Sequence, residues 1–244
     1  MNLVLSFILT PLFYLAFFLI LLIFHPIQFI ALKWFGRNAH DASVAALNYC
    51  IIHSHFIMGS RIKFIDFKQI STEQPLIIVA NHQAVWDMPP LIWMFRKNHL
   101  KFIAKKELSK GIPSISYNLK YGGSVTINRA DGSNAIKKII NFAKQINKDN
   151  YAVCIFPEGS RSKNGRVGDF KSGGLKTLVK QMPNALVVPV AIKGTGKLNN
   201  HGSKLLKFGV NISYTFLDPV RINSKTIDDE LNQIRENIKA IVEE

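Results

Sequence analysis

A histidine and an aspartate five residues apart, His82 and Asp87, are the first candidates for chemistry in this chain. An imidazole that donates a hydrogen bond from one ring nitrogen to a carboxylate keeps its other nitrogen free to accept a proton, which is the arrangement of a general base. On one continuous helix the two side chains would point about 140° apart. They can meet only if the chain turns between them.

The residues on either side of this pair predict such a turn. The apolar, β-branched run Leu76 to Val79 is typical of a buried strand, and Pro89-Pro90 suits the first turn of a helix. We therefore expect His82 and Asp87 in a strand-to-helix turn. A single pair of this spacing is close to what chance gives, so the spacing alone leaves open a surface histidine near a helix N-cap.

Three further polar segments follow predicted strands. The segment FPEGSRS, Phe156 to Ser162, combines a glycine that permits close approach to the backbone with Arg161, whose planar guanidinium suits a phosphate. Glu158 is expected to hold a hydroxyl or to pair with Arg161. The segment GGSVTINR ends on Arg129, and Lys105 follows another strand, although each of these two cations alone is more often a solvated surface charge.

Several familiar sites are disfavoured. The chain has no G-x-S-x-G motif, and its Gly194-Thr-Gly-Lys197 segment lacks the first glycine and the final Ser/Thr of a phosphate-binding P-loop. No Cys/His set has the spacing of a zinc site. His53 and His55 would face about 200° apart on a helix, which favours interfacial histidines over metal ligands. We predict no metal site and no cofactor.

The chain after Arg61 alternates between predicted strands and helices, which indicates an α/β fold with a mostly parallel sheet covered by helices on both faces. Ligands of such sheets bind beyond the carboxyl ends of the strands, so His82, Arg129 and Glu158 are expected at one edge. Strands are predicted at 63–67, 76–80, 101–104, 124–128, 152–156, 186–192 and 208–216. Helices are predicted at 88–97, 109–121, 132–148, 173–181 and 227–242, the last with a capping box of Thr226 and Asp229.

The first 60 residues form an apolar region. Positions 3–24 carry no charge, and about 20 apolar residues cross the hydrocarbon core of a bilayer. Pro11 predicts a kink, and a second apolar segment, 43–58, follows a polar link from Arg37 to Asp41. We therefore expect an N-terminal apolar two-helix membrane motif in 1–60 and one α/β domain in 61–244. A membrane-spanning helix and a hairpin inserted into one leaflet both remain open.

The charge of the chain is strongly positive, with 31 Lys and Arg against 16 Asp and Glu and a net charge of +15. This excess, nearly all of it after residue 60, fits an anionic membrane surface and anionic substrates better than nucleic acid, for which no recognition helix or aromatic RNA motif is present. Lys33 and Arg37 follow the apolar run, which predicts a cytoplasmic body. Cys50 and Cys154 are expected to be reduced and buried, as in a cytosolic protein.

Four motifs in this order closely resemble the glycerolipid acyltransferase family, most nearly the bacterial 1-acylglycerol-3-phosphate acyltransferases. They are N-H-x4-D, G-x5-R, F-P-E-G-S-R-S and V-P-V-A-I at Val188 to Ile192, and the resemblance covers roughly residues 61–218. Ser160 stands where the family usually has Thr and keeps a hydroxyl. Asn128 stands where Asp is common.

The resemblance implies a reaction and a set of roles. His82 would be the general base and Asp87 would orient it, while the V-P-V-A-I strand would shape the acceptor or acyl site. The residues implied or expected to bind the substrate are Arg129, Glu158, Gly159, Ser160, Arg161 and Lys105. The acyl group would pass from a CoA or acyl carrier protein thioester directly to the free hydroxyl of lysophosphatidate, giving phosphatidate without an acyl-enzyme.

Two other interpretations remain open at this point. The same motifs fit a glycerol-3-phosphate acyltransferase or an enzyme acting on another lysolipid. A non-catalytic, basic membrane-binding protein would share the apolar N-terminus and the positive charge. The favoured interpretation predicts an enzyme of the cell inner membrane whose catalytic domain faces the cytoplasm.

Overall fold

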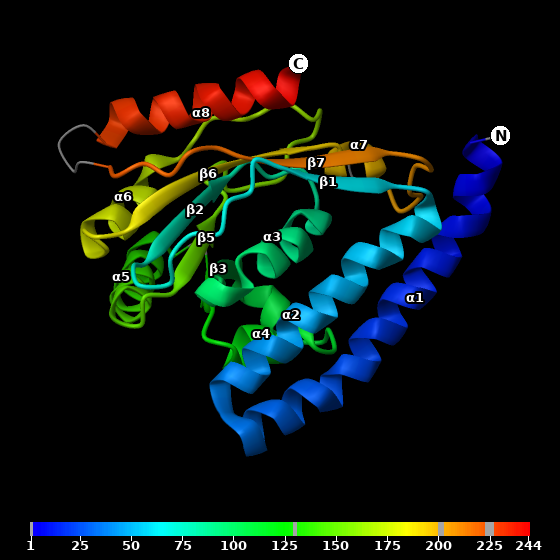
Figure 1. Ribbon diagram of the computed structural model, residues 1–244, viewed down its shortest axis with the longest axis horizontal. Helices are drawn as coiled ribbons and strands as arrows, with labels where there is room; N and C mark the ends of the chain where they lie inside the picture. The colour runs from blue at the N-terminus through cyan, green and yellow to red at the C-terminus, as the bar shows by residue number, and fades with distance from the viewer. Residues whose placement is uncertain (1, 129–130, 200–202, 223–226) are drawn as a thin grey trace.

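The computed structural model of the chain describes all residues except 1, 129–130, 200–202 and 223–226. Seven strands of the described residues form one sheet in the order β1-β7-β6-β2-β5-β3-β4 (Figure 1). The strands are β1 (Arg61–Ile65), β2 (Leu76–Ala80), β3 (Lys101–Lys105), β4 (Val125–Ile127), β5 (Ala152–Ile155), β6 (Leu186–Lys193) and β7 (Asn211–Phe216). Only the pairing of β6 with β7 is antiparallel among the paired strands, so the predicted mostly parallel sheet is confirmed.

The central strand β2 is buried along its whole length, as its apolar sequence predicts. Successive side chains of a strand point to opposite faces, so β2 contributes to two cores. Leu76 and Ile78 belong to one buried cluster, and Ile77 and Val79 belong to the other. A strand that is covered on both faces is rigid, and the turn that follows it starts from a fixed point.

Helices cover both faces of the sheet (Figure 1). The cluster that contains Ile77 includes apolar residues of α5 (Gly132–Lys148), α6 (Ser172–Gln181) and α8 (Ile227–Glu243). The opposite cluster includes residues of α3 (Met88–Met94) and of the N-terminal helices. Two short helices, α4 (Ile115–Tyr121) and α7 (Thr195–Leu198), complete the α-helices of the described part.

Two predicted helices are shorter in the structure. The helix predicted at 88–97 ends at Met94, and a separate 3₁₀ turn follows at Arg96–Asn98. The helix predicted at 109–121 begins only at Ile115, because Gly111 and Ser114 both adopt a positive φ that an α-helix excludes. The start of α8 agrees with the prediction, but Thr226 of the predicted capping box lies outside the described residues.

The N-terminal region forms two helices, α1 (Asn2–Ile30) and α2 (Gly36–Ser54), which Figure 1 shows side by side. Helix α1 continues through Pro11, and the chain reverses in the π-helical turn Ala31–Phe35 and at Gly36, whose φ is +83°. The polar link predicted at 37–41 is wrong, because these residues lie inside α2, where His40 is buried and Asp41 is partly buried against the body. The Arg37 guanidinium donates to the backbone oxygen of Tyr121 there.

One face of α1 is fixed to the body at both ends. The backbone amide of Phe208 donates to the Ser6 hydroxyl, and that of Leu206 donates to the Thr10 hydroxyl. Toward the other end, the Ser114 amide donates to His25 Nδ1, and the Ser114 hydroxyl donates to the Leu21 oxygen. Helix α1 therefore lies along the body over most of its length.

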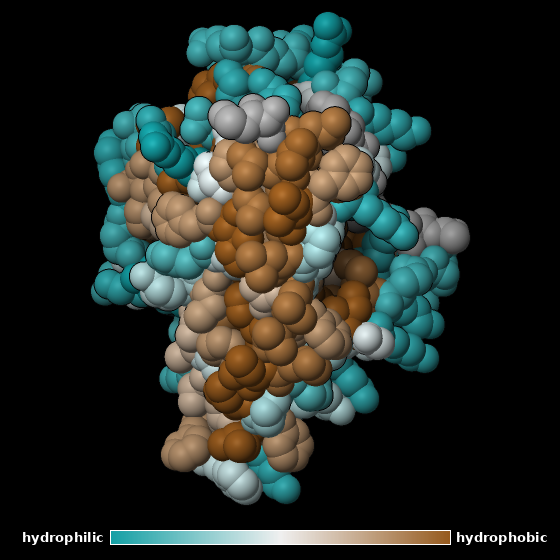
Figure 2. All heavy atoms as spheres, turned by 90° about the vertical axis from the view of Figure 1, so that its right-hand side faces the viewer, coloured by the Kyte–Doolittle hydropathy of each residue, from teal (hydrophilic) through white to brown (hydrophobic). Residues whose placement is uncertain are grey.

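The opposite face of α1 is apolar and exposed. Figure 2 shows it as a continuous hydrophobic band. We call this band the α1 stripe; its members are Leu3, Val4, Phe7, Ile8, Leu12, Leu15, Phe18, Leu19, Leu22, Ile23, Ile27, Phe29 and Ile30. The helical stretch Leu3–Met58 is, by length and composition, apolar enough to cross a membrane.

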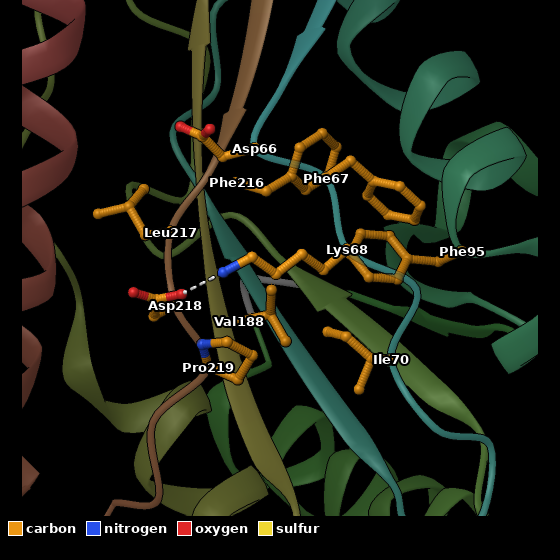
Figure 3. A pocket seen from close by; sticks show the side chains of 10 residues that line it. All are labelled: Asp66, Phe67, Lys68, Ile70, Phe95, Val188, Phe216, Leu217, Asp218 and Pro219. Atoms are coloured by element: carbon orange, nitrogen blue, oxygen red, sulfur yellow. Dashed lines mark hydrogen bonds and ion pairs between the residues drawn. The ribbon is translucent and has the colours of Figure 1, made fainter.

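A small cavity of about 20 Å³ lies at the edge of the sheet where β1 and β7 end (Figure 3). Its lining includes Val188 near the start of β6, and the exposed ion pair of Lys68 with Asp218 lies beside it. This volume holds about one water molecule. Because β7 runs antiparallel to β6, the cavity is at the opposite edge from the carboxyl ends of β2, β5 and β6, where the candidate site lies.

Candidate active site

The turn that carries the candidate base begins with Asn81, directly after β2. The Asn81 carboxamide donates to the backbone oxygen of Ile192 at 2.8 Å and accepts from the Ile192 amide at 2.7 Å. The Asn81 side chain thus makes the two hydrogen bonds to β6 that a backbone N–H and C=O would make if the strand β2 continued. The main chain is thereby released from the sheet one residue before His82.

His82 and Asp87 meet in this turn. The Nδ1 atom of His82 lies 2.7 Å from Oδ2 of Asp87. A carboxylate only accepts, so Nδ1 carries a proton, and in the neutral imidazole Nε2 then presents a lone pair. The described residues give Nε2 no hydrogen-bond partner, and the His82 side chain is 18% exposed, whereas that of Asp87 is fully buried. The imidazole also stacks on the Phe156 ring at 4.3 Å, which limits its rotation.

Four donors hold the buried Asp87 carboxylate. Besides His82, the backbone amides of Gln83 and Ala84 donate to Oδ2 at 2.7 and 2.9 Å, and the Thr195 hydroxyl donates to Oδ1 at 2.5 Å. Sequence reasoning missed Thr195. Its only signal in the sequence is its place directly after a predicted strand, in a Gly-Thr-Gly segment.

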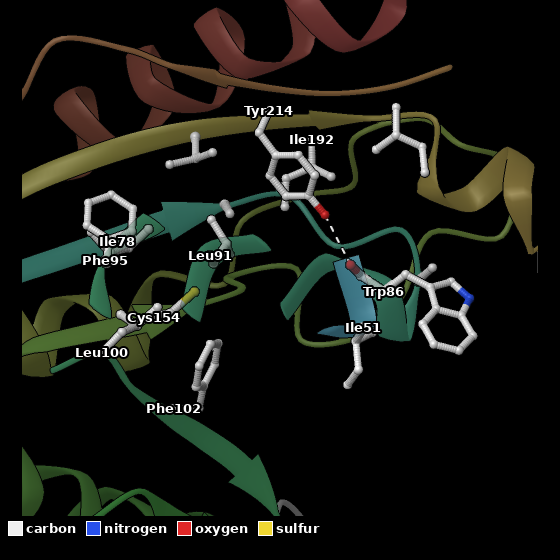
Figure 4. Close-up of a cluster of buried hydrophobic side chains, with 14 of the residues drawn as sticks. Ile51, Ile78, Trp86, Leu91, Phe95, Leu100, Phe102, Cys154, Ile192 and Tyr214 are labelled. Carbon is white, nitrogen blue, oxygen red and sulfur yellow. Dashed lines mark hydrogen bonds between the residues drawn. The ribbon is translucent and has the colours of Figure 1, made fainter. Parts of the chain in front are cut away.

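The turn between His82 and Asp87 is also fixed from the core. Figure 4 shows the Tyr214 hydroxyl pointing to the Trp86 backbone, whose oxygen accepts its hydrogen bond at 3.1 Å. The Trp86 ring packs edge-on against Phe13 and Phe17 of α1, with ring centres 5.1 and 5.3 Å away. The candidate catalytic turn therefore rests directly on the inner face of α1.

Glu158 holds the backbone on both sides of the site. Its Oε1 accepts from the His82 amide at 2.7 Å, and its Oε2 accepts from the Gly168 amide at 3.0 Å. Burial raises the pKa of Glu158, and these two amides oppose that effect. The expected pairing with Arg161 is absent from the ion pairs of the described residues, because both carboxylate oxygens are directed at backbone amides.

Arg161 lies in the loop that passes over His82. The loop is hydrogen-bonded to the His82 backbone at two residues that flank Arg161 in the sequence. Glu158 accepts from the His82 amide, and the Ser162 amide donates to the His82 oxygen at 2.8 Å. Arg161 and Ser160 are exposed, and Arg161 forms no hydrogen bond or ion pair with the described residues. Its guanidinium is therefore available to a ligand.

Gly159 makes this loop possible. Its φ of +73° is in the left-handed region that favours glycine. A Cβ atom at this position would lie 3.5 Å from Nζ of Lys171, a cation that sequence reasoning also missed. No motif marked Lys171, because it is brought to the loop by the hydrogen bond from its amide to the Pro157 oxygen.

The remaining predicted site residues lie farther along the same edge. Lys105 is the exposed last residue of β3. Strand β3 is two places from β2 in the sheet, which is about 10 Å at the usual spacing. Arg129 lies outside the described residues, so only the end of β4 before it is placed. Within the described ranges no group of three or more His, Cys, Asp or Glu could hold a metal ion.

Two predictions concern buried residues, and the one about the cysteines needs correction. The V-P-V-A-I residues of β6 are buried, and the chain that follows them reaches Asp87 through Thr195. Both cysteines are free, as expected, but only Cys154 is fully buried, and burial raises the pKa of its thiol well above the ordinary value. Cys154 is therefore a core thiol and not a nucleophile.

Comparisons with known proteins place the chain among acyltransferases. The chloroplastic 1-acyl-sn-glycerol-3-phosphate acyltransferase LPAT1 of Arabidopsis thaliana is 30% identical over 168 residues, which are 69% of this chain and 45% of that protein. The human 1-acyl-sn-glycerol-3-phosphate acyltransferase beta is 27% identical over 195 residues, 80% of this chain and 67% of that protein. This chain therefore spans about half to two thirds of the length of these relatives.

A solved structure shares the whole fold. The 1-acyl-sn-glycerophosphate acyltransferase PlsC from Thermotoga maritima superposes with a TM-score of 0.79 over 99% of this chain and 98% of that one, at 24% sequence identity. The model of the acyltransferase family matches residues 61–193, from the first strand to the end of β6. With more than half of its residues matched, the chain belongs to the acyltransferase family.

Proposed function

We propose that this chain transfers a fatty acyl group from a CoA or acyl carrier protein thioester to the free hydroxyl of 1-acylglycerol-3-phosphate, giving phosphatidate. The observation that carries the proposal is the His82 imidazole, whose Nδ1 is bound to Asp87 at 2.7 Å while Nε2 is open to a ligand. The printed names of the Arabidopsis and human relatives support the choice of acceptor.

The chemistry follows from the two nitrogens of His82. The acceptor hydroxyl gives its proton to Nε2 as its oxygen attacks the thioester carbon, and Asp87 stabilises the imidazolium that forms. The tetrahedral intermediate then expels the thiolate, which takes the proton from Nε2. A positioned general base contributes roughly 10²- to 10⁴-fold to such a step.

The acceptor phosphate is assigned to the exposed arginine of the loop over His82. Arg161 has no partner among the described residues and is bracketed by two residues that bond the His82 backbone. Arg129, two residues beyond the end of β4 in the sequence, is proposed as a second phosphate ligand, and Lys105 as a source of positive potential. Ser160 and Gly159 present the loop to the ligand, whereas we assign Glu158 to positioning His82. Aligning two reactants in this way supplies about 7 to 11 kcal/mol of a barrier.

The proposal places the body on a membrane. The α1 stripe is exposed and apolar, and the chain carries a net charge of +15. Both lipids of the reaction reside in a bilayer, so an apolar helix beside the catalytic turn delivers the acceptor to the base. The positive charge attracts anionic headgroups.

We further propose that α1 lies in one leaflet and does not cross the bilayer. Hydrogen bonds join α1 to the body at Ser6, Thr10 and His25, which span most of its length. If α1 crossed the bilayer, the loops of the polar body that are hydrogen-bonded to α1 would have to lie in the hydrocarbon core. With the basic body on the cytoplasmic side, the protein would act at the inner face of the cell inner membrane.

The proposal is tested with His82→Ala. This variant should lose thiol release and phosphatidate formation from lysophosphatidate with both acyl-CoA and acyl carrier protein. Binding to anionic vesicles should be retained, because α1 is unchanged. Near-normal turnover in the variant removes the proposal.

Related acceptors distinguish the alternatives. Glycerol 3-phosphate, or a lysolipid without a phosphate, used faster than lysophosphatidate by the wild-type protein, would assign one of the sibling activities. Arg161→Ala should mainly raise the KM of lysophosphatidate. A non-catalytic basic membrane-binding protein would bind vesicles and consume no thioester with any acceptor.

A further inference from the structure

A positively charged cavity lies beside the turn that carries His82. It has a volume of about 220 Å³ and opens between the end of β6, the loop at 164–166 and the end of α8. Its charged lining residues are Arg166, Lys193, Lys197 and Glu243, and Gln83 also lines it. None of the four charged residues has a role in the mechanism proposed above.

The cations of this cavity are not neutralised by their neighbours. Lys193 donates to the Ile241 backbone oxygen at 3.3 Å, and the Glu243 carboxylate accepts from the Val167 amide at 3.1 Å. None of the three cations forms an ion pair with a carboxylate of the described residues. A concave site with an excess of one charge concentrates ligands of the opposite charge, so this cavity favours an anion.

The order of the strands separates the two lysines of this cavity from the proposed acceptor clamp. Strand β2 lies between β5 and β6, and Arg161 follows β5 whereas Lys193 and Lys197 follow β6. The third cation of the cavity, Arg166, lies in the same loop as Arg161, five residues further along the chain. An anion bound by the two lysines would therefore lie on the β6 side of His82, and an anion bound by Arg161 would lie on the side of the loop that follows β5.

Gln83 joins the cavity to the base. It directly follows His82, and its backbone amide donates to Asp87 at 2.7 Å. Its side chain donates to the Gly165 oxygen at 3.1 Å and accepts from the Gly196 amide at 3.3 Å. The wall of the cavity is thus a rigid continuation of the catalytic turn.

We propose that this cavity binds the phosphate of the phosphopantetheine arm of the acyl donor. The inference rests on the proposed acyl transfer and assigns the second substrate of that site. A volume of 220 Å³ is below the usual range of about 300 to 1,000 Å³ for whole small molecules, so it fits a phosphate and the adjoining part of the arm. The arm and its phosphate are common to CoA and acyl carrier protein, and the flexible arm carries the thioester from the cavity to His82.

The test is the double variant Lys193→Gln/Lys197→Gln, with Lys137→Gln/Lys138→Gln as the matched control. The control pair is exposed on α5 and removes the same charge away from the cavity. The cavity variant should raise the KM of acyl-CoA and of acyl carrier protein at least about tenfold, because each loses charged hydrogen bonds to phosphate. The KM of lysophosphatidate should stay near the wild-type value in neutral detergent micelles, as should both values in the control.

Two synthetic donors isolate the phosphate. Acyl-4′-phosphopantetheine should respond to the cavity variant as acyl-CoA does, whereas acyl-pantetheine, which lacks the phosphate, should be used equally by both proteins. If only acyl-CoA responds, the cavity binds the nucleotide part of CoA and the proposal is overturned. If only acyl carrier protein responds, the lysines contact the protein surface, with the same consequence.

Direct binding separates this inference from the proposed activity. Equilibrium dialysis of 4′-phosphopantetheine should show binding to the wild-type protein and its loss in the cavity variant, whether or not the wild type turns over. A raised KM for lysophosphatidate with unchanged donor values would assign the cavity to the acceptor. Weaker binding of the cavity variant than of the control to vesicles containing phosphatidylglycerol, again with unchanged donor values, would assign it to lipid headgroups. Either result overturns the proposal.

Discussion

The Asp87 carboxylate has its hydrogen bonds in place before any substrate arrives. Its two oxygens accept from His82, from two backbone amides and from Thr195, although the side chain has no exposure to water. These hydrogen bonds matter because burying a carboxylate oxygen without a hydrogen bond raises the free energy of the folded state, and such a carboxylate is also free to rotate. The tautomer of His82 is therefore set by the whole turn and not by one contact.

Thr195→Val removes the donor to Oδ1 at almost unchanged volume. Loss of a hydrogen bond to a buried charged group costs about 1.5 to 3 kcal/mol, so kcat should fall roughly tenfold to a hundredfold. The KM of both substrates should change little, because Thr195 reaches the reaction only through Asp87. Steady-state kinetics measure both quantities. Thr195→Ser keeps the hydroxyl and should retain most of the activity; equal losses in the two variants would show that the hydroxyl is not what matters.

Glu158→Gln separates positioning from substrate binding. Glutamine has the same shape, but its NH₂ group would face the backbone N–H of either His82 or Gly168. Two donors cannot pair, so one of the two hydrogen bonds is lost. We expect the free energy of unfolding to fall by about 1 to 3 kcal/mol. The melting temperature and kcat should both decrease, with an unchanged KM for lysophosphatidate. A raised KM at an unchanged melting temperature would instead support the contact with the acceptor that the sequence resemblance implies.

Local patterns predicted the contact of His82 with Asp87 but could not predict that of Asp87 with Thr195. The first pair lies within one turn, marked by the apolar strand before it and Pro89-Pro90 after it. Asp87 and Thr195 are 108 positions apart and meet because β6 is a neighbour of β2 in the sheet. The order of strands depends on long-range packing that no local pattern encodes.

At the scale of elements, a buried ion pair joins helix α2 to the sheet. Nζ of Lys101, at the start of β3, lies 2.7 Å from both carboxylate oxygens of Asp41, and His99 Nδ1 lies 2.8 Å from one of them. Lys101 is only 4% exposed. Breaking such a pair is costly because one charge stays buried without its partner.

Asp41→Asn should therefore destabilise the fold by about 3 to 5 kcal/mol. Burial lowers the pKa of Lys101, and Asp41 opposes this effect, so the variant should release the Lys101 proton at lower pH. In that pH window the unfolded chain holds a proton that the folded chain lacks, so stability rises with pH. The gap in melting temperature between variant and wild type should therefore narrow as the pH rises toward the ordinary pKa of lysine, about 10.4.

Asp218→Asn is the matched control for this prediction. Its partner Lys68 is 80% exposed and Asp218 is 89% exposed, so the exposed pair is worth at most about 1 kcal/mol. The control should melt close to the wild type at every pH. Similar losses in Asp41→Asn and Asp218→Asn would refute the structural role of the buried pair.

Most elements were predictable because their residues alternate or repeat at the expected period. The bounds of α5 agree with the predicted 132–148, and β2 agrees with 76–80. The prediction of a link at 37–41 is wrong because polar residues are typical of links between helices. In the structure Arg37 contacts Tyr121 and Asp41 contacts Lys101, and both partners lie far along the sequence and give no local signal.

At the scale of the whole molecule, α1 joins the turn of His82 and Asp87 to an exposed apolar surface. Its inner face packs on Trp86, between His82 and Asp87 in the chain, and its outer face is the α1 stripe (Figure 2). The sequence predicted the apolar region but not its orientation. The orientation depends on bonds from α1 to residues 114, 206 and 208, which only the folded chain brings together.

The double variant Phe7→Asp/Leu15→Asp tests whether the α1 stripe holds the protein on a bilayer. Both side chains are more than half exposed, so the fold should tolerate the change. Burying two such side chains in lipid is worth about 1.5 to 3 kcal/mol each, so sedimentation with vesicles should show binding weakened at least about a hundredfold. Activity on lysophosphatidate dispersed in detergent should persist, because the inner face of α1 is unchanged.

The matched control, Ile136→Asp, adds a charge at an exposed apolar position on α5, away from α1. It should bind vesicles like the wild type. Unchanged binding in the double variant would mean that the basic body alone attracts the membrane, in which case binding should vanish at high salt. A stripe that inserts into the leaflet predicts the opposite for the wild type: binding that largely survives salt, because burial of apolar side chains is not screened.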